Sequence, residues 1–253
     1  MLFDTHAHLD DARFDEDREQ VIRKLRAQGV ELVVNVGADM KGCENSVRLA
    51  EQYDFIYAAV GLHPYDAQDM TEADLGLIQQ LAGHKKVVAI GEIGLDYHYD
   101  EADKEKQKLW FYRQIKLAEE LNLPYIVHDR DAHADCLDII RRSGYFRGVM
   151  HCYSGSVEMA KELLDLGFYI SFAGPVTFKN GKKAKEVALD LPMERLLIET
   201  DCPYLSPEPH RGERNDSSKV RFVAETIAEL KGMSVEELSR ITYENGKRFF
   251  LIQ

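Results

Sequence analysis

Short apolar stretches alternate with longer amphipathic stretches from one end of the chain to the other. The short stretches are rich in β-branched residues, which favours strands, and the longer ones repeat apolar residues at helical spacing. The predicted strands cover residues 2–8, 31–38, 55–64, 87–97, 124–131, 148–155, 168–174 and 195–203. The helical patterns include residues 15–29, 105–122, 156–167, 218–233 and 234–250.

Several helical stretches end at glycine, the residue that most often terminates a helix in the left-handed conformation. These glycines are Gly29, Gly144 and Gly167. Ser234 followed by Glu237 predicts a capping box at the start of the last helix.

Eight strand–helix units within 253 residues are typical of an α/β protein with a single (β/α)8 fold, the TIM barrel. No linker or change of composition divides the chain, so residues 1–253 are predicted to form one domain. A doubly wound open sheet shows the same alternation. The barrel is favoured because no Gly-x-Gly-x-x-Gly opens a helix and because polar residues gather at the C-terminal ends of the strands.

The composition is that of an ordinary globular protein, with 45% hydrophobic and 30% charged residues. There is no apolar run long enough to cross a bilayer and no signal-peptide pattern, so no membrane partner is expected. The four cysteines are scattered without Cys-x-x-Cys spacing, which disfavours a disulfide framework or a cysteine zinc cluster. The expected location is therefore cytoplasmic.

The chain carries a net charge of −12, from 32 basic and 44 acidic residues. At long range such a chain repels a polyanion, which argues against nucleic-acid binding over its whole surface. A local basic patch can still reverse this effect at one site.

Two histidines stand one residue apart in the first predicted strand, within "DTHAHLD" at residues 4–10. Because side chains alternate along a strand, His6 and His8 point to the same side. Two neutral imidazoles placed in this way form half of a metal site. An exposed polar strand end gives the same short motif, so the interpretation depends on ligands from elsewhere in the chain.

Further ligand-type residues stand at the C-terminal ends of later strands. Together with the first pair, the set comprises His6, His8, Glu92, His128, His151 and Asp201. In a closed barrel these strand ends converge on one mouth. A lone histidine at a strand end is more often structural than ligating, but six such groups together carry a burial cost that metal ions usually offset.

The set divides between two divalent metal ions per subunit, with His6, His8 and Asp201 around one ion, His128 and His151 around the other, and the two Glu92 oxygens bridging them. Two ions about 3.5–4 Å apart activate a water and hold the attacking and leaving oxygens of a displacement. The mixed nitrogen and oxygen donors suit Zn²⁺ or Mn²⁺ better than Mg²⁺. Asp201 can also accept the proton of the attacking water, which makes Asp201 and Glu92 catalytic candidates.

Two residues near the expected mouth allow two interpretations each. Glu199 lies two residues before Asp201 and faces the same way if both belong to a strand. It either orients a ligand or handles a proton, or it is a buried partner of a nearby Lys or Arg. His63, in "GLHP" after the third strand, either contacts a substrate anion, which we favour, or fills a polar loop.

Other residues near the strand ends are expected to have lesser roles. Residues 96–98 follow Glu92 and are expected to shape the pocket, whereas residues 130–131 are at least as readily explained as a loop ion pair. Cys152 and Cys202 each follow a candidate ligand, so their side chains are expected to point away from the cavity. Both cysteines are interpreted as packing residues and not as nucleophiles.

Seven segments resemble the signature segments of the TatD family of metal-dependent deoxyribonucleases, in that family's order and spacing and across essentially the whole chain. They are "DTHAHLD", "GLHP", "GEIGLDY", "HCYSGS", "TFKN", "ETDCPYL" and "PHRGERN". The resemblance implies a TIM barrel and a dinuclear site formed by the six ligands named above. It also implies divalent-ion-dependent trimming of single-stranded DNA from the 3′ end, with Mg²⁺ or Mn²⁺ as the working metal.

The sequence departs from the family pattern in one place. After "RGERN" the family usually continues with Glu-Pro-Ala-Tyr-Val, whereas residues 216–220 read "DSSKV". We expect this loop to border the mouth and to bear on substrate preference. The related amidohydrolases often bridge their metals with a modified lysine on the fourth strand, where this chain has Glu92.

Basic residues follow the last two predicted strands. "KNGKKAK" at residues 179–185 contains four lysines, and "PHRGER" adds Arg211 and Arg214. Strand-to-helix loops form the mouth of a barrel and often bind phosphate, so Lys179 and Arg211 are predicted to contact substrate. Lys182, Lys183 and Lys185 are equally well explained as the first turn of a solvated helix.

The predicted partner is single-stranded DNA or another phosphodiester, and the sequence indicates no obligate protein partner. Two other functions fit the same ligands. A metal-dependent amidase or esterase would act on a small or acylated substrate and would not depend on Lys179 or Arg211. A non-catalytic metal-binding scaffold would bind metal tightly and hydrolyse nothing.

Overall fold

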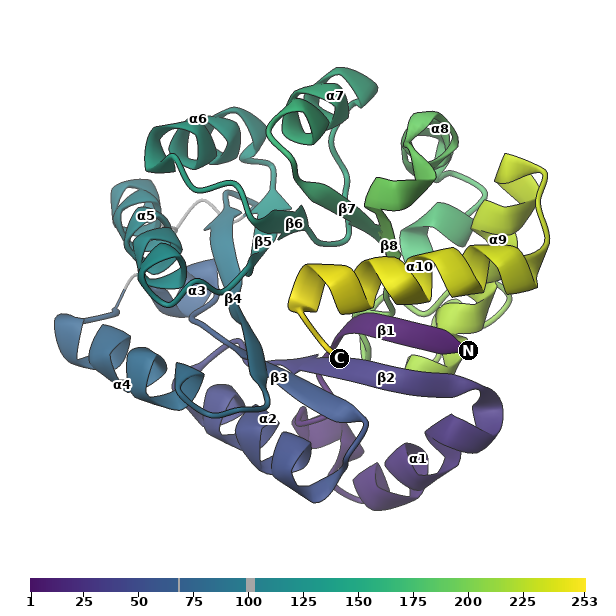
Figure 1. Ribbon diagram of the computed structural model, residues 1–253, viewed down its shortest axis with the longest axis horizontal. Helices are drawn as coiled ribbons and strands as arrows, with labels where there is room; N and C mark the ends of the chain where they lie inside the picture. Colours follow the sequence, from purple (N-terminus) through teal and green to yellow (C-terminus); the bar gives the residue numbers. More distant parts are fainter. Residues whose placement is uncertain (68, 99–102) are drawn as a thin grey trace.

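The computed structural model describes residues 1–67, 69–98 and 103–253. Its strands form a single parallel sheet of eight, in chain order from first to last, and the sheet curls into a nearly closed barrel (Figure 1). The predicted TIM-barrel fold is therefore confirmed, and the open-sheet alternative is wrong. The strands are β1 (Leu2–Ala7), β2 (Val30–Val36), β3 (Ile56–Val60), β4 (Val87–Asp96), β5 (Tyr125–Arg130), β6 (Gly148–Met150), β7 (Tyr169–Phe172) and β8 (Leu196–Ile198).

Helices surround the barrel and join successive strands (Figure 1). The α-helices are α1 (Arg18–Leu25), α2 (Met40–Gln52), α3 (Pro64–Ala67), α4 (Glu72–Ala82), α5 (Lys104–Glu120), α6 (His133–Ser143), α7 (Val157–Asp165), α8 (Lys182–Asp190), α9 (Val220–Lys231) and α10 (Val235–Phe250). The 3-10 turns are η1 (Ala12–Phe14), η2 (Arg26–Gln28), η3 (Gly174–Thr177), η4 (Met193–Arg195) and η5 (Ser217–Lys219). No helix in the described part of the chain has the length and apolar character that a membrane crossing requires.

The glycines predicted to end helices and the predicted cap of the last helix are found in the structure. Gly29, Gly144 and Gly167 all have positive φ angles, of 87°, 71° and 98°. Ser234 caps α10 by accepting a hydrogen bond from the amide of Glu237 at 3.1 Å. This bond is the N-cap half of the predicted capping box.

The strands β6 and β8 end earlier than the sequence predicts. Met150 is the last residue of β6 and Ile198 the last of β8. His151, Glu199 and Asp201 therefore lie in the loops that follow, and Asp201 has a φ of 58°, outside the strand region. The expected alternation of Glu199 and Asp201 along a strand is wrong, because the backbone turns between them.

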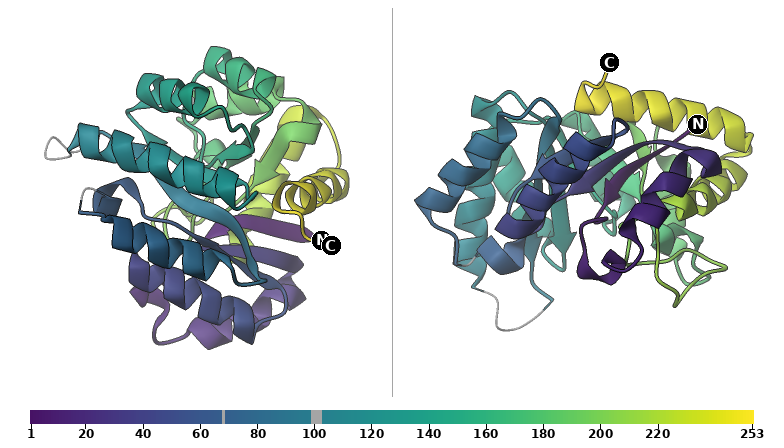
Figure 2. Two further views of the ribbon diagram at one scale, coloured as in Figure 1. Left: turned by 60° about the vertical axis from the view of Figure 1, so that its left-hand side comes forward. Right: turned by 90° about the horizontal axis from the view of Figure 1, so that it is seen from below.

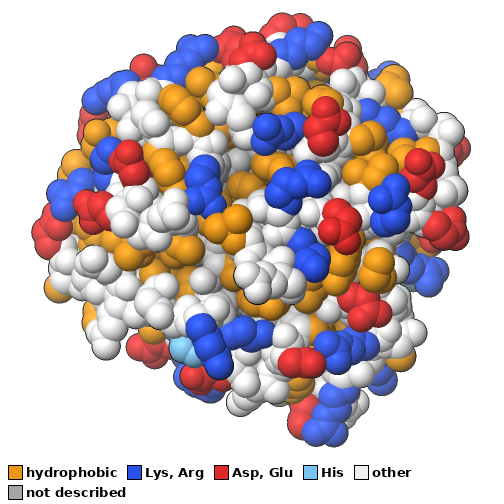
Figure 3. Space-filling view, viewed as in Figure 1, with side chains coloured by type: hydrophobic (Ala, Val, Ile, Leu, Met, Phe, Trp, Pro, Cys, Tyr) orange, Lys and Arg blue, Asp and Glu red, His pale blue; other side chains and the backbone are white. Residues whose placement is uncertain are grey.

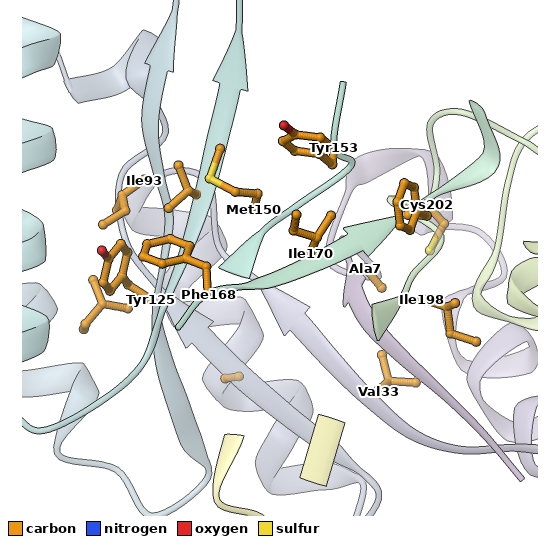
Figure 4. Packing of buried hydrophobic residues seen from close by; sticks show 14 of the residues in the cluster. Ala7, Val33, Ile93, Tyr125, Met150, Tyr153, Phe168, Ile170, Ile198 and Cys202 are labelled. Atoms are coloured by element: carbon orange, nitrogen blue, oxygen red, sulfur yellow. The ribbon is translucent and has the colours of Figure 1, made fainter. Parts of the chain in front are cut away.

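The core has two layers. A larger layer lies between the sheet and the surrounding helices, and part of it, including Ile93, Met150 and Ile170, is visible in Figure 4. A smaller layer fills the barrel and the underside of α10, where Phe250 packs on Phe3 with ring centroids 5.9 Å apart. This packing places α10 across the end of the barrel where the strands begin.

The two ends of the barrel therefore differ. Figure 2 (right) shows α10 and both termini at one end and the long loops that follow the strands at the other. On the face that α10 crosses, acidic, basic and apolar side chains are intermixed without a broad patch of one sign (Figure 3). The open end is therefore the one at which the strands finish.

The barrel closes between β8 and β1 through a short seam. Only one isolated bridge, between Ala7 and Cys202, joins these segments in the described chain. Across the seam the amide of Asp201 donates to the carbonyl of His6 at 2.9 Å, and the amide of His8 donates to the carbonyl of Cys202 at 2.8 Å. These bonds fix the position of Asp201 relative to the first histidine pair.

Side chains complete the seam. Asp4, which is fully buried, accepts hydrogen bonds from the amide of Thr200 at 2.8 Å and from its hydroxyl at 2.6 Å. Thr5 donates to the carbonyl of Ile198 at 2.9 Å. Because so few backbone bonds join β1 to β8, these side chains carry much of the closure.

We expect Thr200→Val to destabilise the protein by about 1–3 kcal/mol, because it removes a donor from a buried carboxylate. The measurement is the free energy of unfolding in urea. Thr226→Val is the matched control, since the Thr226 hydroxyl donates to the Phe222 carbonyl within α9 and takes no part in the seam, and it should cost less than about 0.5 kcal/mol. Equal losses in both variants would contradict a special role of the seam.

Candidate metal centre

The six predicted ligands meet at the open end of the barrel. His6 and Glu92 lie within β1 and β4, His128 lies within β5, and the others follow β1, β6 and β8. The Nε2 atoms of His6 and His8 are 3.1 Å apart. The Oδ1 atom of Asp201 lies 3.7 Å from Nε2 of His6 and 3.4 Å from Nε2 of His8.

Glu92 stands between two pairs of histidines. Its Oε2 atom lies 3.5 Å from Nε2 of His6 and 3.7 Å from Nε2 of His8. Its Oε1 atom lies 2.7 Å from Nδ1 of His128 and 2.9 Å from Nε2 of His151. The two oxygens of one carboxylate therefore face two separate sets of donors.

The first of these sets has the spacing of ligands around a small cation. Donor atoms about 2.0–2.1 Å from a tetrahedral ion lie about 3.3 Å from one another. The Nε2 atoms of His6 and His8 are 3.1 Å apart, and the carboxylate oxygens of Glu92 and Asp201 each lie 3.4 to 3.7 Å from both of them. The residues present thus fit a bound divalent ion without rearrangement of the backbone.

Electrostatics also favour a cation here. Although burial favours its neutral form, the charge of His151 and hydrogen bonds from His128 and His151 hold the pKa of Glu92 well below its usual range. Burial lowers the pKa of His8, but Asp201 outweighs it and raises that pKa to about 9. Protons on histidines therefore offset part of the carboxylate charge, and metal binding would displace those protons.

Three of the four histidines are oriented by an acceptor on the ring nitrogen that faces away from the cluster. Nδ1 of His8 lies 2.7 Å from the carbonyl of Val36. Nε2 of His128 lies 2.9 Å from Oδ2 of Asp96, and Nδ1 of His151 lies 3.0 Å from Oε1 of Glu199. Such partners fix the tautomer and ring orientation of ligating histidines.

Glu199 and Asp96 hold equivalent positions behind the second histidine pair. Glu199 is 1% exposed and also accepts a hydrogen bond from the amide of Cys152 at 2.7 Å. Asp96 is likewise 1% exposed and accepts from the amide of His98 at 3.0 Å. The contacts of Glu199 match the ligand-orienting interpretation and include no Lys or Arg among the described residues.

A close approach of β4 to β5 brings Glu92 to His128. Gly94 has a φ of 149°, and a Cβ atom at this position would lie 1.9 Å from the carbonyl oxygen of His128. Any side chain would push the two strands apart. Glycine in "GEIGLDY" is therefore required by the packing of the site.

A cavity of about 1130 Å³ opens from the cluster. His8, Glu92, His128, His151 and Asp201 line it, and so does His63. It extends along α2, where Lys41, Asn45, Arg48 and Gln52 lie on its wall. The basic residues of α2 were not predicted from the sequence, because nothing in the helical pattern indicates that this face of α2 borders the cavity.

Of the three residues predicted to contact substrate, His63 lies at the cavity, whereas Lys179 and Arg211 lie outside its wall. The ring of His63 lies 4.4 Å from that of His128, and burial lowers the pKa of His63 to about 3, so this imidazole is neutral. Lys179 is exposed and Arg211 lies over the ring of Phe178 at 4.2 Å. Neither Lys179 nor Arg211 is among the residues that line the cavity.

Several expectations about nearby loops are corrected. Residues 216–220 do not line the cavity, contrary to prediction, and Asp216 instead caps η5. Asp131 pairs with His98 at 3.0 Å, and Arg130 lines the cavity. Lys182 and Lys183 begin α8, as the helical explanation predicts.

The two cysteines near the site differ in position. Cys202 is buried at the seam beside Ser217, whereas Cys152 lines the cavity, contrary to expectation. Burial raises the pKa of both thiols well above the usual range. Both are therefore neutral thiols, which agrees with the prediction that neither is a nucleophile.

Buried histidines and carboxylates at the C-terminal end of a TIM barrel define the class of metal-dependent hydrolases, and sequence comparison assigns the family. A family model described as TatD related DNase matches residues 3–251. An uncharacterized metal-dependent hydrolase of Bacillus subtilis, YabD, is 55% identical over the full length of both chains. The chain belongs to the TatD family.

Other relatives agree with this assignment. The uncharacterized metal-dependent hydrolase YcfH of Escherichia coli K12 is 42% identical, over 100% of this chain and 96% of its own length. The crystal structure of YJJV, a TatD homologue of Escherichia coli K12, has a TM-score of 0.94 and 30% identity, and covers 100% of this chain and 98% of its own. A mutant organophosphorus hydrolase of Deinococcus radiodurans shares the fold, with a TM-score of 0.68 at 14% identity.

We expect Glu199→Gln and Asp96→Asn each to weaken metal binding about 10- to 100-fold, because each removes the carboxylate that orients a histidine. Equilibrium dialysis with Mn²⁺ measures the affinity. Asp131→Asn is the control, since it also removes a carboxylate that pairs with a histidine, His98, but outside the cluster. Unchanged affinity in both test variants would show that these carboxylates do not support the site.

Proposed function

We propose that this protein is a divalent-metal-dependent deoxyribonuclease that shortens single-stranded DNA from the 3′ end and uses two ions per subunit. The observation that carries the proposal is the position of Glu92, whose two oxygens face two histidine pairs at the end of an open cavity. Two ions bridged by a carboxylate suit the displacement of a phosphodiester oxygen. Membership of a family described as TatD related DNase supports the same substrate class.

The chain's own residues have distinct roles in this proposal. Bound divalent ions would polarise the phosphodiester and lower the pKa of the attacking water. Asp201 lines the cavity beside His8, where its carboxylate can accept the proton of that water. Glu199 and Asp96 keep the rings of His151 and His128 in place through the hydrogen bonds described above.

The identity of the ions is part of the proposal. Four imidazoles and two carboxylates suit Zn²⁺ or Mn²⁺ better than Mg²⁺, which prefers oxygen ligands. The family resemblance instead implies Mg²⁺ or Mn²⁺. Mn²⁺ satisfies both arguments, so we propose Mn²⁺ as the ion that supports the highest activity.

We also propose a cytoplasmic location. All four cysteines are free, and Cys43, Cys136 and Cys202 are buried. A chain that keeps free thiols suits a reducing compartment.

An acyl substrate remains the second candidate because acidic side chains also line the cavity. Asp10, Asp39 and Asp66 lie on its wall. These carboxylates disfavour an anionic substrate unless bound cations offset them. A neutral amide or ester would not meet this repulsion.

The direct test is digestion of end-labelled single-stranded DNA by metal-stripped protein restored with Mg²⁺, Mn²⁺ or Zn²⁺. We expect stepwise shortening from the 3′ end that requires an added ion. Glu92→Gln and His128→Ala should each lower the rate more than about 100-fold, because each removes a ligand of the proposed centre. Gel electrophoresis of the labelled products gives both the rate and the direction.

Glu186→Gln serves as the control because Glu186 is an exposed glutamate on α8, and it should leave the rate unchanged. Cleavage that proceeds without metal, or that survives in Glu92→Gln, would exclude the dinuclear mechanism. Metal binding without DNA cleavage, together with turnover of a p-nitrophenyl ester, would favour the acyl candidate. Metal binding without hydrolysis of either substrate would favour a scaffold.

A second test concerns the basic residues that contact phosphate. Lys41 and Arg48 line the cavity, whereas Lys179 and Arg211 do not. We therefore expect replacement of the α2 pair to weaken DNA binding more than replacement of Lys179 and Arg211. Replacing Lys41 and Arg48 together with Gln should raise KM for DNA and lower the slope of log affinity against log salt by about 0.7 per lost phosphate contact. The Lys179→Gln/Arg211→Gln variant provides the comparison. A larger change in that variant would favour the contacts predicted from the sequence.

A further inference from the structure

An exposed aromatic and aliphatic pair borders the cavity next to the metal centre. Tyr204 is 47% exposed and Leu205 is 38% exposed, and both line the cavity. The other large hydrophobic residues that are exposed in the described chain lie outside the cavity wall: Met1, Leu77, Leu109, Leu189 and Leu251. The apolar surface at the cavity is therefore concentrated three and four residues after Asp201.

The ring of Tyr204 is held between charged and aromatic neighbours. The guanidinium of Arg13 lies over it, 4.0 Å from the ring centroid, and Arg13 is itself fixed by two hydrogen bonds to Asp11 at 2.9 and 2.7 Å. The phenol hydroxyl lies 3.4 Å from Oδ2 of Asp11. The ring of His8 meets that of Tyr204 edge-on, with centroids 6.1 Å apart. The exposed ring is thus adjacent to a proposed metal ligand.

The backbone beneath the pair is fixed from several sides. The amide of Tyr204 donates to the carbonyl of Asp201 at 2.9 Å, and the side chain of Asn215 donates to the carbonyl of Tyr204 at 2.7 Å. Leu205 packs against Gly174, where a Cβ atom would lie 1.8 Å from the Leu205 carbonyl oxygen. A half-exposed ring on so constrained a backbone is pre-organised for a ligand, since little freedom remains to be lost on binding.

We propose that Tyr204 and Leu205 form a stacking platform for a nucleobase attached next to the cleaved bond, an inference that rests on the proposed nuclease function. The phosphodiester must reach Glu92 and Asp201, and the ring of Tyr204 lies beside that point. A nucleobase is the flat, neutral part of the substrate, so it suits the apolar edge of an otherwise charged cavity. Stacking on an aromatic ring does not depend on base identity, as trimming of mixed sequences requires.

The test compares oligonucleotides with a complete 3′ end and with an abasic residue at either of the last two positions. The terminal linkage is a non-hydrolysable phosphonate, and affinity is measured by fluorescence anisotropy. We expect the native protein to bind the complete end between about 5- and 150-fold more tightly than one of the abasic ends. In Tyr204→Ala this ratio should fall to near one, whereas Tyr204→Phe should keep most of it because the ring remains.

A spectroscopic measurement separates stacking from a general loss of affinity. 2-Aminopurine at the same position should lose fluorescence on binding to the native protein and to Tyr204→Phe, and should keep it with Tyr204→Ala. Tyr57→Ala is the matched control, since Tyr57 also has a cation over its ring, Lys86 at 4.0 Å, but lies outside the cavity wall. It should retain the discrimination of the native protein.

The possible results distinguish a failure of the stacking proposal from a failure of the proposed nuclease function. Equal affinity of the native protein for complete and abasic ends would overturn the platform and leave the nuclease proposal standing. An unchanged ratio in Tyr204→Ala would have the same consequence. A native protein that neither binds nor cleaves the corresponding natural oligonucleotide would overturn both proposals.

Discussion

The arrangement of the site depends on the closure of the barrel between β8 and β1. The first histidine pair lies at the beginning of the chain and Asp201 almost 200 residues later, so only this closure brings them within 3.4–3.7 Å. Few backbone bonds cross the seam, and the buried carboxylate of Asp4 supplements them by binding Thr200. The same "DTHAHLD" segment therefore supplies two candidate ligands and part of the bonding that places a third.

Closure of the barrel also brings several carboxylates together in a buried place, where uncompensated charge is energetically costly. Glu92, buried on a strand between two histidine pairs, is compensated in the metal-free protein by protonated imidazoles. Asp96 and Glu199 add two more buried carboxylates behind those rings. These carboxylates orient the rings of His128 and His151 toward Glu92. They also leave the cluster with more negative than positive charge, and a bound divalent cation stabilises a site of that kind.

The fold and the six candidate ligands could be predicted from the sequence because both follow from periodicity. Alternating side chains place His6 and His8 together, and parallel strands place all C-terminal ends at one mouth. Features that depend on the path of a loop could not be predicted in this way. The early ends of β6 and β8, the face that α2 turns to the cavity and the exposure of Tyr204 all arise from tertiary packing, for which a single sequence gives no repeating signal.

The net charge of −12 does not by itself determine the electrostatic potential at the cavity. Carboxylates such as Asp11 and Asp15 line the cavity, but each is paired with an arginine, Arg13 or Arg18, so much of this wall is locally neutral. Asp10, Asp39 and Asp66 also lie on the wall, but Glu92 and Asp201 lie at the cluster, where metal ions would reverse the sign of the local field. An acidic protein can therefore attract an anionic substrate only locally, at the metal ions and at the basic residues of α2, and further contacts can come from surfaces that do not depend on charge. The apolar edge formed by Tyr204 and Leu205 is such a surface, so the proposed nucleic-acid substrate is compatible with the acidic net charge of the chain.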